Sequence, residues 1–248
     1  MLRLSKVMSS NNPKKSILGR LSGFWSEERN LTVLLGIIIF DFFVLPSLTS
    51  VIGERLIINL LNSLALSLLL LTGLFALTRH KAVQAVFAVI VALVISVRWG
   101  RLLFGVSWLA GWDIFLSFVS FLTFAVVVLG HVYKEGPMTS HRIQGAVAAY
   151  LLLAMTFALA YFLAEFMAPF SFQLGNMPMQ LDEQSWRVFY YFSISTLTTV
   201  GYGDITPIQP VARNLAMAEA LIGQLYPAIL LARLVSLHIQ SRHSKKDD

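Results

Sequence analysis

The stretch SISTLTTVGYGDITP, residues 193–207, determines how the rest of the chain is interpreted. Within it, Gly201 and Gly203 alternate with the bulky residues Val200 and Tyr202. Glycine adopts left-handed backbone conformations without strain from a Cβ atom, so this spacing lets consecutive carbonyl oxygens point the same way along an axis. Such oxygens replace the water around a dehydrated cation when several chains meet at the axis. One copy of the stretch per chain therefore predicts an assembly of four chains.

This stretch resembles the selectivity-filter signature of the tetrameric potassium channel family. The residues that carry the resemblance are Thr199, Val200, Gly201, Tyr202 and Gly203 (TVGYG), followed by Asp204. The resemblance covers the pore region, roughly residues 143–237. It implies a potassium-selective channel made of identical subunits, a homotetramer, with no cofactor. It also implies the ligands of the permeant potassium ion, which are backbone oxygens at Thr199, Val200, Gly201 and Tyr202.

A pore helix is expected directly before the filter. Asp182 can cap its amino terminus, and the aromatic residues within 186–192 form a bulky collar on it. Its carboxyl end, near Leu197, would point toward a central cavity, where the negative end of the helix dipole favours a cation. The alternative is a surface amphipathic helix followed by a glycine turn. It is disfavoured because irregular backbone at membrane depth needs protein or a water-filled cavity around it.

Four residues beside the filter are expected to support it, namely Thr198, Asp204, Ser195 and Tyr191. Asp204 fits the outer mouth, where it either attracts cations or accepts a hydrogen bond from Tyr191. Members of the potassium channel family often have a glutamate where this chain has Ser195, so a carboxylate pair with Asp204 is not expected. The Thr199 hydroxyl is expected to add an oxygen at the inner mouth.

Composition indicates a membrane protein. Hydrophobic residues make up 56% of the 248 residues, more than in ordinary soluble domains, and charged residues make up only 13%, fewer than in such domains. A bilayer core of about 30 Å requires roughly 20 apolar residues in a helix. Six stretches meet this requirement, at approximately 31–52, 56–78, 82–103, 112–132, 143–167 and 211–237. The predicted fold class is an all-α integral membrane protein with six transmembrane helices, a re-entrant pore helix and a selectivity filter, assembled as a tetramer.

The chain is expected to divide into four parts. Residues 1–30 are a basic cytoplasmic segment, either a helix on the inner membrane surface or an irregular tail. Residues 31–133 should form four transmembrane helices, residues 143–238 the pore domain, and residues 239–248 a short cytoplasmic tail. Lysine and arginine are concentrated in the two termini and in every second loop between the six predicted spans. Because basic loops face the cytoplasm, both termini are expected there. A bacterial inner membrane fits the short basic tail.

The sixth predicted span contains Glu219, Gly223 and Pro227 at intervals of four residues. Pro227 has no N–H to bond the carbonyl of Gly223, and glycine is a weak helix former, so a bend is expected there. The bend is either a gating hinge or a static kink that shapes the cavity. Glu219 either faces the cavity and concentrates cations, or lies behind the filter, protonated or hydrogen-bonded to a group such as Ser195. The second placement is favoured.

The four helices before the pore lack a basic voltage sensor. Residues 114–132 of the fourth predicted span contain no lysine or arginine, so strong voltage gating is not expected. Arg98 and Arg101 share a face of the third span and are expected to anchor it at the interface rather than to sense voltage. The polar residues Asp41, Asn59 and Asn62 are expected to join an interhelical hydrogen-bond cluster that reaches Arg98.

Other classes of protein are disfavoured. No nucleophile, base or metal set suggests an enzyme. The net charge of +6 is explained by membrane orientation rather than by nucleic acid. About ten residues follow the sixth span, too few for a soluble regulatory domain in this chain. A less selective cation channel is disfavoured because Tyr202 and both filter glycines are present, and a subunit that only scaffolds other channels stays open as an alternative.

Overall fold

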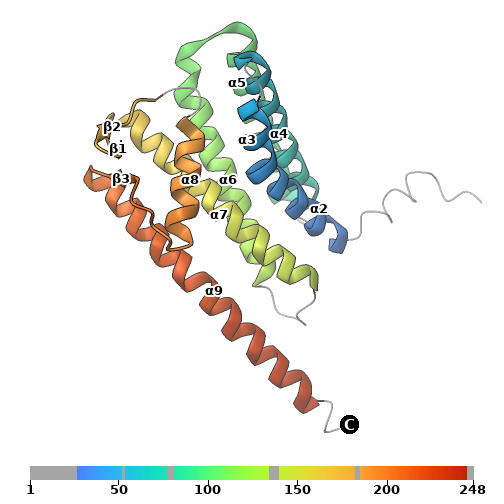
Figure 1. Ribbon diagram of the computed structural model, residues 1–248. Helices are drawn as coiled ribbons and strands as arrows, with labels where there is room; N and C mark the ends of the chain where they lie inside the picture. The colour runs from blue at the N-terminus through green and yellow to red at the C-terminus, as the bar shows by residue number, and fades with distance from the viewer. Residues whose placement is uncertain (1–26, 52–53, 77–80, 134–139, 182–184, 245–248) are drawn as a thin grey trace, which may run out of the picture.

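The structure is a computed structural model that describes residues 27–51, 54–76, 81–133, 140–181 and 185–244. Helices make up most of this part of the chain (Figure 1), as expected for an all-α membrane protein. Most of the predicted N-terminal segment, up to residue 26, and the predicted cap Asp182 lie outside the described residues. The elements, in chain order, are α2 (Glu27–Ile39), the π-helical turn η1 (Phe40–Val44), α3 (Leu45–Val51), α4 (Arg55–Ala76), α5 (Lys81–Phe104), the 3-10 turn η2 (Ser107–Leu109), α6 (Ala110–Val132), α7 (Ser140–Met167), β1 (Phe172–Leu174), β2 (Met177–Pro178), α8 (Ser185–Leu197), β3 (Ile205–Pro207) and α9 (Pro210–Ser244).

Within the described residues, five helices are long and apolar enough to cross a membrane, α4, α5, α6, α7 and α9. They correspond to five of the six predicted spans. The first predicted span, 31–52, consists instead of α2, η1 and α3, and its apolar part, Thr32–Leu48, is shorter. The wide turn of η1 and the proline Pro46 interrupt regular α-helix in this region. A count of six spans stays a prediction.

Helix α9 is longer than expected. It ends at Ser244, beyond the predicted span 211–237 and within the predicted tail, 239–248. After Pro227 the sequence has neither glycine nor proline, and nothing in it signals an earlier end of the helix. In Figure 1 the carboxyl end of α9 projects past the other helices.

Helix α7 lies between two groups of helices (Figure 1). On one side it packs on α2 and α6, which together with α4 and α5 form a four-helix group. On the other side it packs on α8 and α9. Its buried face is rich in alanine, including Ala146, Ala149 and Ala158, and small residues let helix backbones approach closely in membranes. Helix α7 therefore connects the four-helix group to the part of the chain that contains the predicted filter.

A three-stranded antiparallel sheet lies beyond the end of α7, in the order β2-β1-β3. Leu174 in β1 pairs with Met177 in β2 and with Ile205 in β3. The sequence did not lead us to predict these strands, because segments of two or three residues are too short for an alternating pattern. Since β3 directly follows the predicted filter, the sheet joins the filter's outer end to the end of α7.

The ring of Phe172 in β1 is the centre of a buried aromatic cluster. It makes edge-to-face contacts with Tyr161, Phe189 and Phe192, at centroid distances of 5.5, 5.0 and 5.5 Å. Edge-to-face pairs stabilise packing by about 0.5–1.5 kcal/mol beyond the burial of area. Tyr161 belongs to α7 and the other two rings to α8, so the cluster fixes α8 against α7.

Two arginines of α5 share one acidic partner in the first turn of α6. Nε of Arg98 lies 3.0 Å from Oδ1 of Asp113, and Nη2 of Arg101 lies 3.1 Å from Oδ2 of the same carboxylate. Arg98 also donates a hydrogen bond of 3.1 Å to the hydroxyl of Ser117. The hydrogen bonds of Arg98 go to Asp113 and Ser117 on α6, because the charged group of Asp113 supplies a strong partner. The predicted cluster of Asp41, Asn59 and Asn62 that reaches Arg98 stays a prediction. Both arginines join α5 to α6.

We predict that Asp113→Ala lowers thermal stability more than Arg101→Ala does. Loss of the carboxylate leaves Arg98, whose side chain is 13% exposed, without its charged partner, and breaking a buried pair in this way costs about 3–5 kcal/mol. The Arg101 side chain is 45% exposed, and an exposed pair contributes only about 0–1 kcal/mol. The midpoint of thermal unfolding in detergent measures both effects. Equal losses in the two variants would contradict the unequal burial.

Candidate functional site

The residues predicted to form the filter alternate in backbone handedness. Thr199, Gly201 and Gly203 have φ angles of 61°, 57° and 79°, whereas Val200 and Tyr202 are outside the positive-φ region. Alternation of left-handed and right-handed conformations turns successive peptide planes the same way, so their carbonyl oxygens can face one side of the chain. Glycine adopts positive φ without strain, but a β-branched residue such as Thr199 does so at a cost of about 1–3 kcal/mol. The surrounding contacts must offset that cost.

Ser195 of α8 binds three consecutive amides of this loop. Its backbone carbonyl accepts the N–H groups of Val200 at 2.9 Å and of Gly201 at 3.1 Å. Its hydroxyl accepts the N–H of Tyr202 at 3.4 Å. A serine at this position therefore fixes the loop by hydrogen bonds to the backbone, where a glutamate would offer a carboxylate. Nearby, the Thr198 hydroxyl donates to the carbonyl of Ile194 at 2.6 Å, which closes the end of the helix.

The outer end of the loop is attached to the sheet. The carbonyl of Asp204 accepts the N–H of Gly175 at 2.7 Å, and its side-chain Oδ1 accepts the N–H of Ile205 at 3.1 Å. The rings of Tyr191 and Tyr202 stack with their centroids 6.0 Å apart and their planes 6° apart. Partial desolvation and the nearby Asp204 carboxylate raise the pKa of the Tyr191 hydroxyl above its usual value. The structure thus brings Tyr191, Tyr202 and Asp204 together.

The loop lies on the surface of the single chain. Residues 198–204 are all exposed, and the side chains of Val200 and Tyr202 are 54% and 70% exposed. A Cβ atom added at Gly201 or Gly203 would meet nothing within 4 Å. In the described part of the chain Tyr202 packs only on one side, against the ring of Tyr191, and Val200 stays half exposed.

Gly223 of α9 allows a close approach to the end of α8. A Cβ atom at Gly223 would lie 2.0 Å from the carbonyl oxygen of Leu197, far inside van der Waals contact. The same oxygen accepts a hydrogen bond of 2.9 Å from the hydroxyl of Tyr150 in α7. The sequence prediction offered only a hinge or a kink at Gly223, and the structure adds this third reason for a glycine. Helix α9 is continuous through Pro227, so the choice between a gating hinge and a static kink stays open.

Glu219 is fully buried behind α8, with an exposed fraction of 0%. One carboxyl oxygen contacts the hydroxyl of Ser193, and the other accepts a hydrogen bond from the hydroxyl of Tyr161. Of the two placements considered from the sequence, the structure has the one behind the filter, but the pore-helix partner is Ser193 rather than Ser195. Glu219 therefore connects α9 to both α8 and α7.

Ser193 connects Glu219 to α7 as well. Its hydroxyl donates to the carbonyl of Ala154 in α7 at 2.7 Å and also contacts the Glu219 carboxyl. The Ser193 hydroxyl of α8 therefore has partners on both α7 and α9.

Several residues that build the site were not found from the sequence. Tyr150, Tyr161 and Ser193 lie within apolar helices, and a hydroxyl there gives no indication of its partner. Glu165, 1% exposed, accepts the N–H groups of Phe170 at 2.7 Å and Phe172 at 3.0 Å and so shapes the turn after α7. Glu165 could have been identified from the sequence because it is a charged residue within a predicted span, and such residues usually have a functional or structural role. Within the described residues, no cluster of three His, Cys, Asp or Glu side chains could hold a metal ion.

Comparisons with known proteins identify the family. A family model described as "Ion channel" matches residues 149–240, from α7 to α9. Protein LctB of Bacillus caldotenax is 36% identical over 120 residues, which is 45% of this chain and 89% of that protein. The chain belongs to this ion channel family. It is accordingly an integral membrane protein and not an enzyme.

Two other relatives share shorter regions with the chain. The two pore potassium channel c of Oryza sativa subsp. japonica is 50% identical over 46 residues, which is 18% of this chain and 10% of that protein. The inward rectifier potassium channel Kirbac3.1 of Paramagnetospirillum magnetotacticum is 34% identical over 80 residues, which is 32% of this chain and 24% of that protein. The chain thus spans less than a quarter of either potassium channel. No solved structure matches the chain.

We predict that Gly223→Ala destabilises the protein whereas Pro227→Ala does not. The new methyl group would collide with the Leu197 carbonyl, a backbone atom that cannot move without shifting α8. Alanine is otherwise the better helix former by about 1 kcal/mol, so a position that served only as a flexible hinge would gain stability from the change. The thermal unfolding midpoint of each purified variant measures this. A Gly223→Ala protein as stable as the unmodified chain would contradict the close approach.

Proposed function

We propose that the chain is a subunit of a potassium-selective channel that conducts potassium passively across a membrane. The observation that carries the proposal is the exposed loop 199–203, whose residues alternate in handedness while Ser195 binds its amides. With the amides bonded to α8, the carbonyl oxygens are the groups left to replace water around an ion. The ion's ligands would be backbone oxygens of Thr199, Val200, Gly201 and Tyr202, with the Thr199 hydroxyl at the inner end and no cofactor.

Four identical chains would complete the filter. The single chain leaves Val200 and Tyr202 mostly exposed, and neighbouring subunits would cover these side chains while their own loops close the cage of oxygens. Helix α9 also exposes large apolar residues such as Met217, Leu221 and Leu225, which suit contacts with neighbouring chains or lipid. Thr198, Asp204, Ser195 and Tyr191 would support the filter within each chain.

The relatives support potassium as the permeant ion. Two of them, from rice and from Paramagnetospirillum magnetotacticum, are named as potassium channels. A channel that does not discriminate sodium from potassium is the second candidate, and it would differ only in how well the loop fits a dehydrated ion.

Gating is assigned to α9 rather than to a voltage sensor. Gly223 and Pro227 would let the inner half of the helix move relative to the half that contacts α8. Helix α6 has no lysine or arginine, and both Arg98 and Arg101 of α5 are paired with Asp113. Charges that are paired within the four-helix group have little freedom to cross a membrane field, so strong voltage gating is not proposed.

The proposed topology has six spans and both termini in the cytoplasm. Helices α2 and α3, with η1 between them, form a continuous run from Glu27 to Val51, whose length of about 1.5 Å per residue would suffice for the first span. Relatives in Bacillus caldotenax and Paramagnetospirillum magnetotacticum support a bacterial inner membrane. The segment before α2 would lie on the cytoplasmic side.

Potassium flux from liposomes that contain only the purified chain tests the proposal. We expect flux that strongly prefers potassium over sodium and that disappears in Gly201→Ala, because an L-residue at a φ of 57° is strained by about 1–2 kcal/mol in each chain. Gly130→Ala is the matched control, since a Cβ atom there would meet nothing within 4 Å and the residue lies within α6. Reversal potentials under bi-ionic conditions measure selectivity.

Three results would point elsewhere. Equal sodium and potassium permeability would favour the nonselective channel. A chain that forms no homotetramer and passes no current would favour a scaffolding subunit. Flux that persists unchanged in Gly201→Ala would remove the loop from the conduction path.

We further predict that Glu219→Gln keeps the flux while Glu219→Ala loses it. Glutamine keeps a carbonyl acceptor and offers an N–H donor at the same position, so it can still hydrogen-bond to both Ser193 and Tyr161, whose hydroxyls can donate or accept. Alanine leaves both hydroxyls without their partner and creates a cavity behind α8, a combination that typically costs several kcal/mol. The measurement is flux per tetramer together with the thermal unfolding midpoint. Loss of flux in Glu219→Gln would show that an ionised carboxylate is needed.

A further inference from the structure

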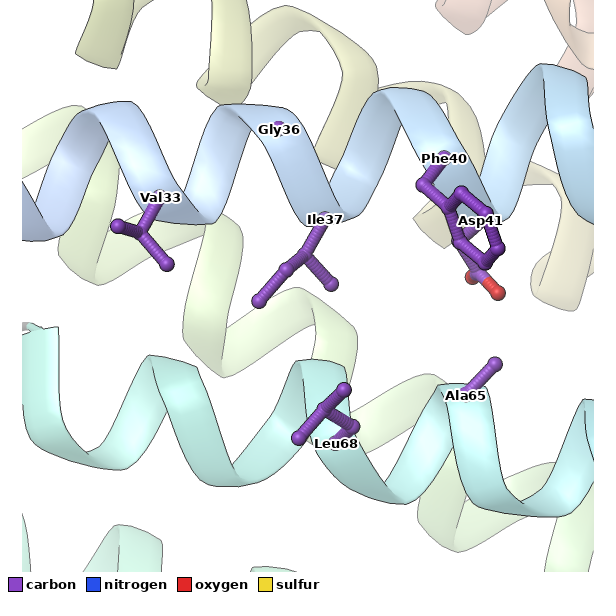
Figure 2. Close-up of a pocket in the computed structure, with 7 residues that line it drawn as sticks. All are labelled: Val33, Gly36, Ile37, Phe40, Asp41, Ala65 and Leu68. Carbon is purple, nitrogen blue, oxygen red and sulfur yellow. The ribbon is translucent and has the colours of Figure 1, made fainter.

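A groove between α2 and α4 contains a buried carboxylate beside otherwise apolar walls (Figure 2). It has a volume of about 230 Å³, and three of its side chains, Val33, Phe40 and Leu68, are about half exposed, so the groove opens on the outer face of the chain. Its lining consists of Val33, Gly36, Ile37, Phe40, Asp41, Ala65 and Leu68. Asp41 is the one polar side chain among them.

The carboxylate of Asp41 has no partner among the described residues. Only 6% of the residue is exposed, yet no hydrogen bond or ion pair to it is formed within the described part of the chain. The cation whose charge acts on it, Arg98, directs its own hydrogen bonds to Asp113 and Ser117. Figure 2 shows the two carboxyl oxygens of Asp41 directed from η1 toward α4, near Ala65. A carboxylate left in this environment is costly unless a cation or a proton compensates it.

The lining does not suit water or a metal ion. An ordered water needs two to four polar partners, and a calcium ion six to eight oxygen ligands, whereas the groove offers one carboxylate. An organic ammonium group is different, because the apolar chain attached to it can pack against apolar walls while the charge pairs with one acid.

We propose that this groove binds a hydrophobic organic cation, an ammonium group on an apolar chain whose charge pairs with Asp41. The apolar chain would lie along Ile37 and Val33 on α2 and along Leu68 on α4. Entry would be from the bilayer, past the half-exposed Phe40 and Leu68. Binding at this place does not depend on which ion the pore conducts.

The groove is next to the pore helix. Asp41 lies in the π-helical turn η1, where the following residue, Phe42, is also buried. The ring of Phe42 packs edge to face on Tyr190 of α8, with centroids 4.1 Å apart. The hydroxyl of Tyr190 is buried without a hydrogen-bond partner in the described part of the chain, so no polar contact fixes that end of the ring. A cation that pairs with Asp41 would therefore act on a turn in direct contact with the helix that supports the filter.

The test is photolabelling of the full-length chain in lipid nanodiscs. The probe is decylamine with a diazirine at the end of its chain, and the neutral counterpart is the matching decanol. Labelled peptides are identified by mass spectrometry after proteolysis. We expect the amine, and not the alcohol, to label peptides of α2 and α4 that line the groove.

Three variants separate the groove from general partitioning into lipid. Asp41→Asn should reduce labelling by roughly tenfold or more, since a charge-assisted hydrogen bond is replaced by a neutral contact. Ala65→Phe keeps the carboxylate but fills the groove, and should reduce labelling as well. Glu54→Gln removes one negative charge from an exposed position at the start of α4 and should leave labelling unchanged. Thermal unfolding midpoints establish that each variant is folded.

The outcomes are distinct. Labelling by amine and alcohol to the same extent, or unchanged labelling in Asp41→Asn, would overturn the site. Absence of groove labelling in the unmodified chain, with crosslinks to a neighbouring subunit instead, would show that another copy covers the groove and would also overturn it. If decylamine changes the ion flux of the unmodified chain but not that of Asp41→Asn, binding in the groove affects the pore. If decylamine instead blocks the central cavity, the change in flux persists in Asp41→Asn.

Discussion

The rest of the structure depends on one constraint, that irregular backbone at membrane depth must have its amides bonded while its carbonyl oxygens stay free. Unsatisfied peptide groups in lipid cost several kcal/mol each, so a loop survives there only when protein or a water-filled cavity takes every polar group. Ser195 meets half of this constraint by accepting the amides of Val200, Gly201 and Tyr202. Under the proposed function, the carbonyl oxygens remain for an ion.

Because the loop depends on α8, the surrounding elements serve mainly to fix α8. The aromatic cluster around Phe172 holds its amino-terminal half, Glu219 holds its middle through Ser193, and Tyr150 with Gly223 holds its last carbonyl. The small sheet fixes the far end of the loop by pairing β3 with β1. These contacts come from α7, α9 and the sheet, so the strain stored at Thr199 is opposed from several directions.

The sequence predicted features that have a recognisable pattern along the chain, and it did not predict contacts between residues that are distant in the sequence. The long apolar helices follow from composition, and the left-handed conformation of Gly201 and Gly203 follows from their alternation with larger residues. The close approach at Gly223 could not be predicted, because a glycine in a helix looks the same whether it bends or touches a neighbour. Glu219 was recognisable as unusual from its charge, but its partner Ser193 was not, since serines are common along the same helix. The positive φ of Thr199 has no signal in the residue type, because a β-branched residue disfavours that conformation.

The four-helix group packs on α7 through two helices, α2 and α6. The charged residues near these two contacts are arranged differently. At the α5–α6 end, two arginines share the carboxylate of Asp113, which leaves one positive charge uncompensated there. Another acid of this group, Asp41, lies on η1 beside α8, whereas the hydrogen bonds of Arg98 go to Asp113 and Ser117. The contact of Phe42 with Tyr190 joins η1 to α8 directly, without passing through the ion pairs between α5 and α6. The four-helix group therefore has a direct connection to α8 that is independent of its arginines.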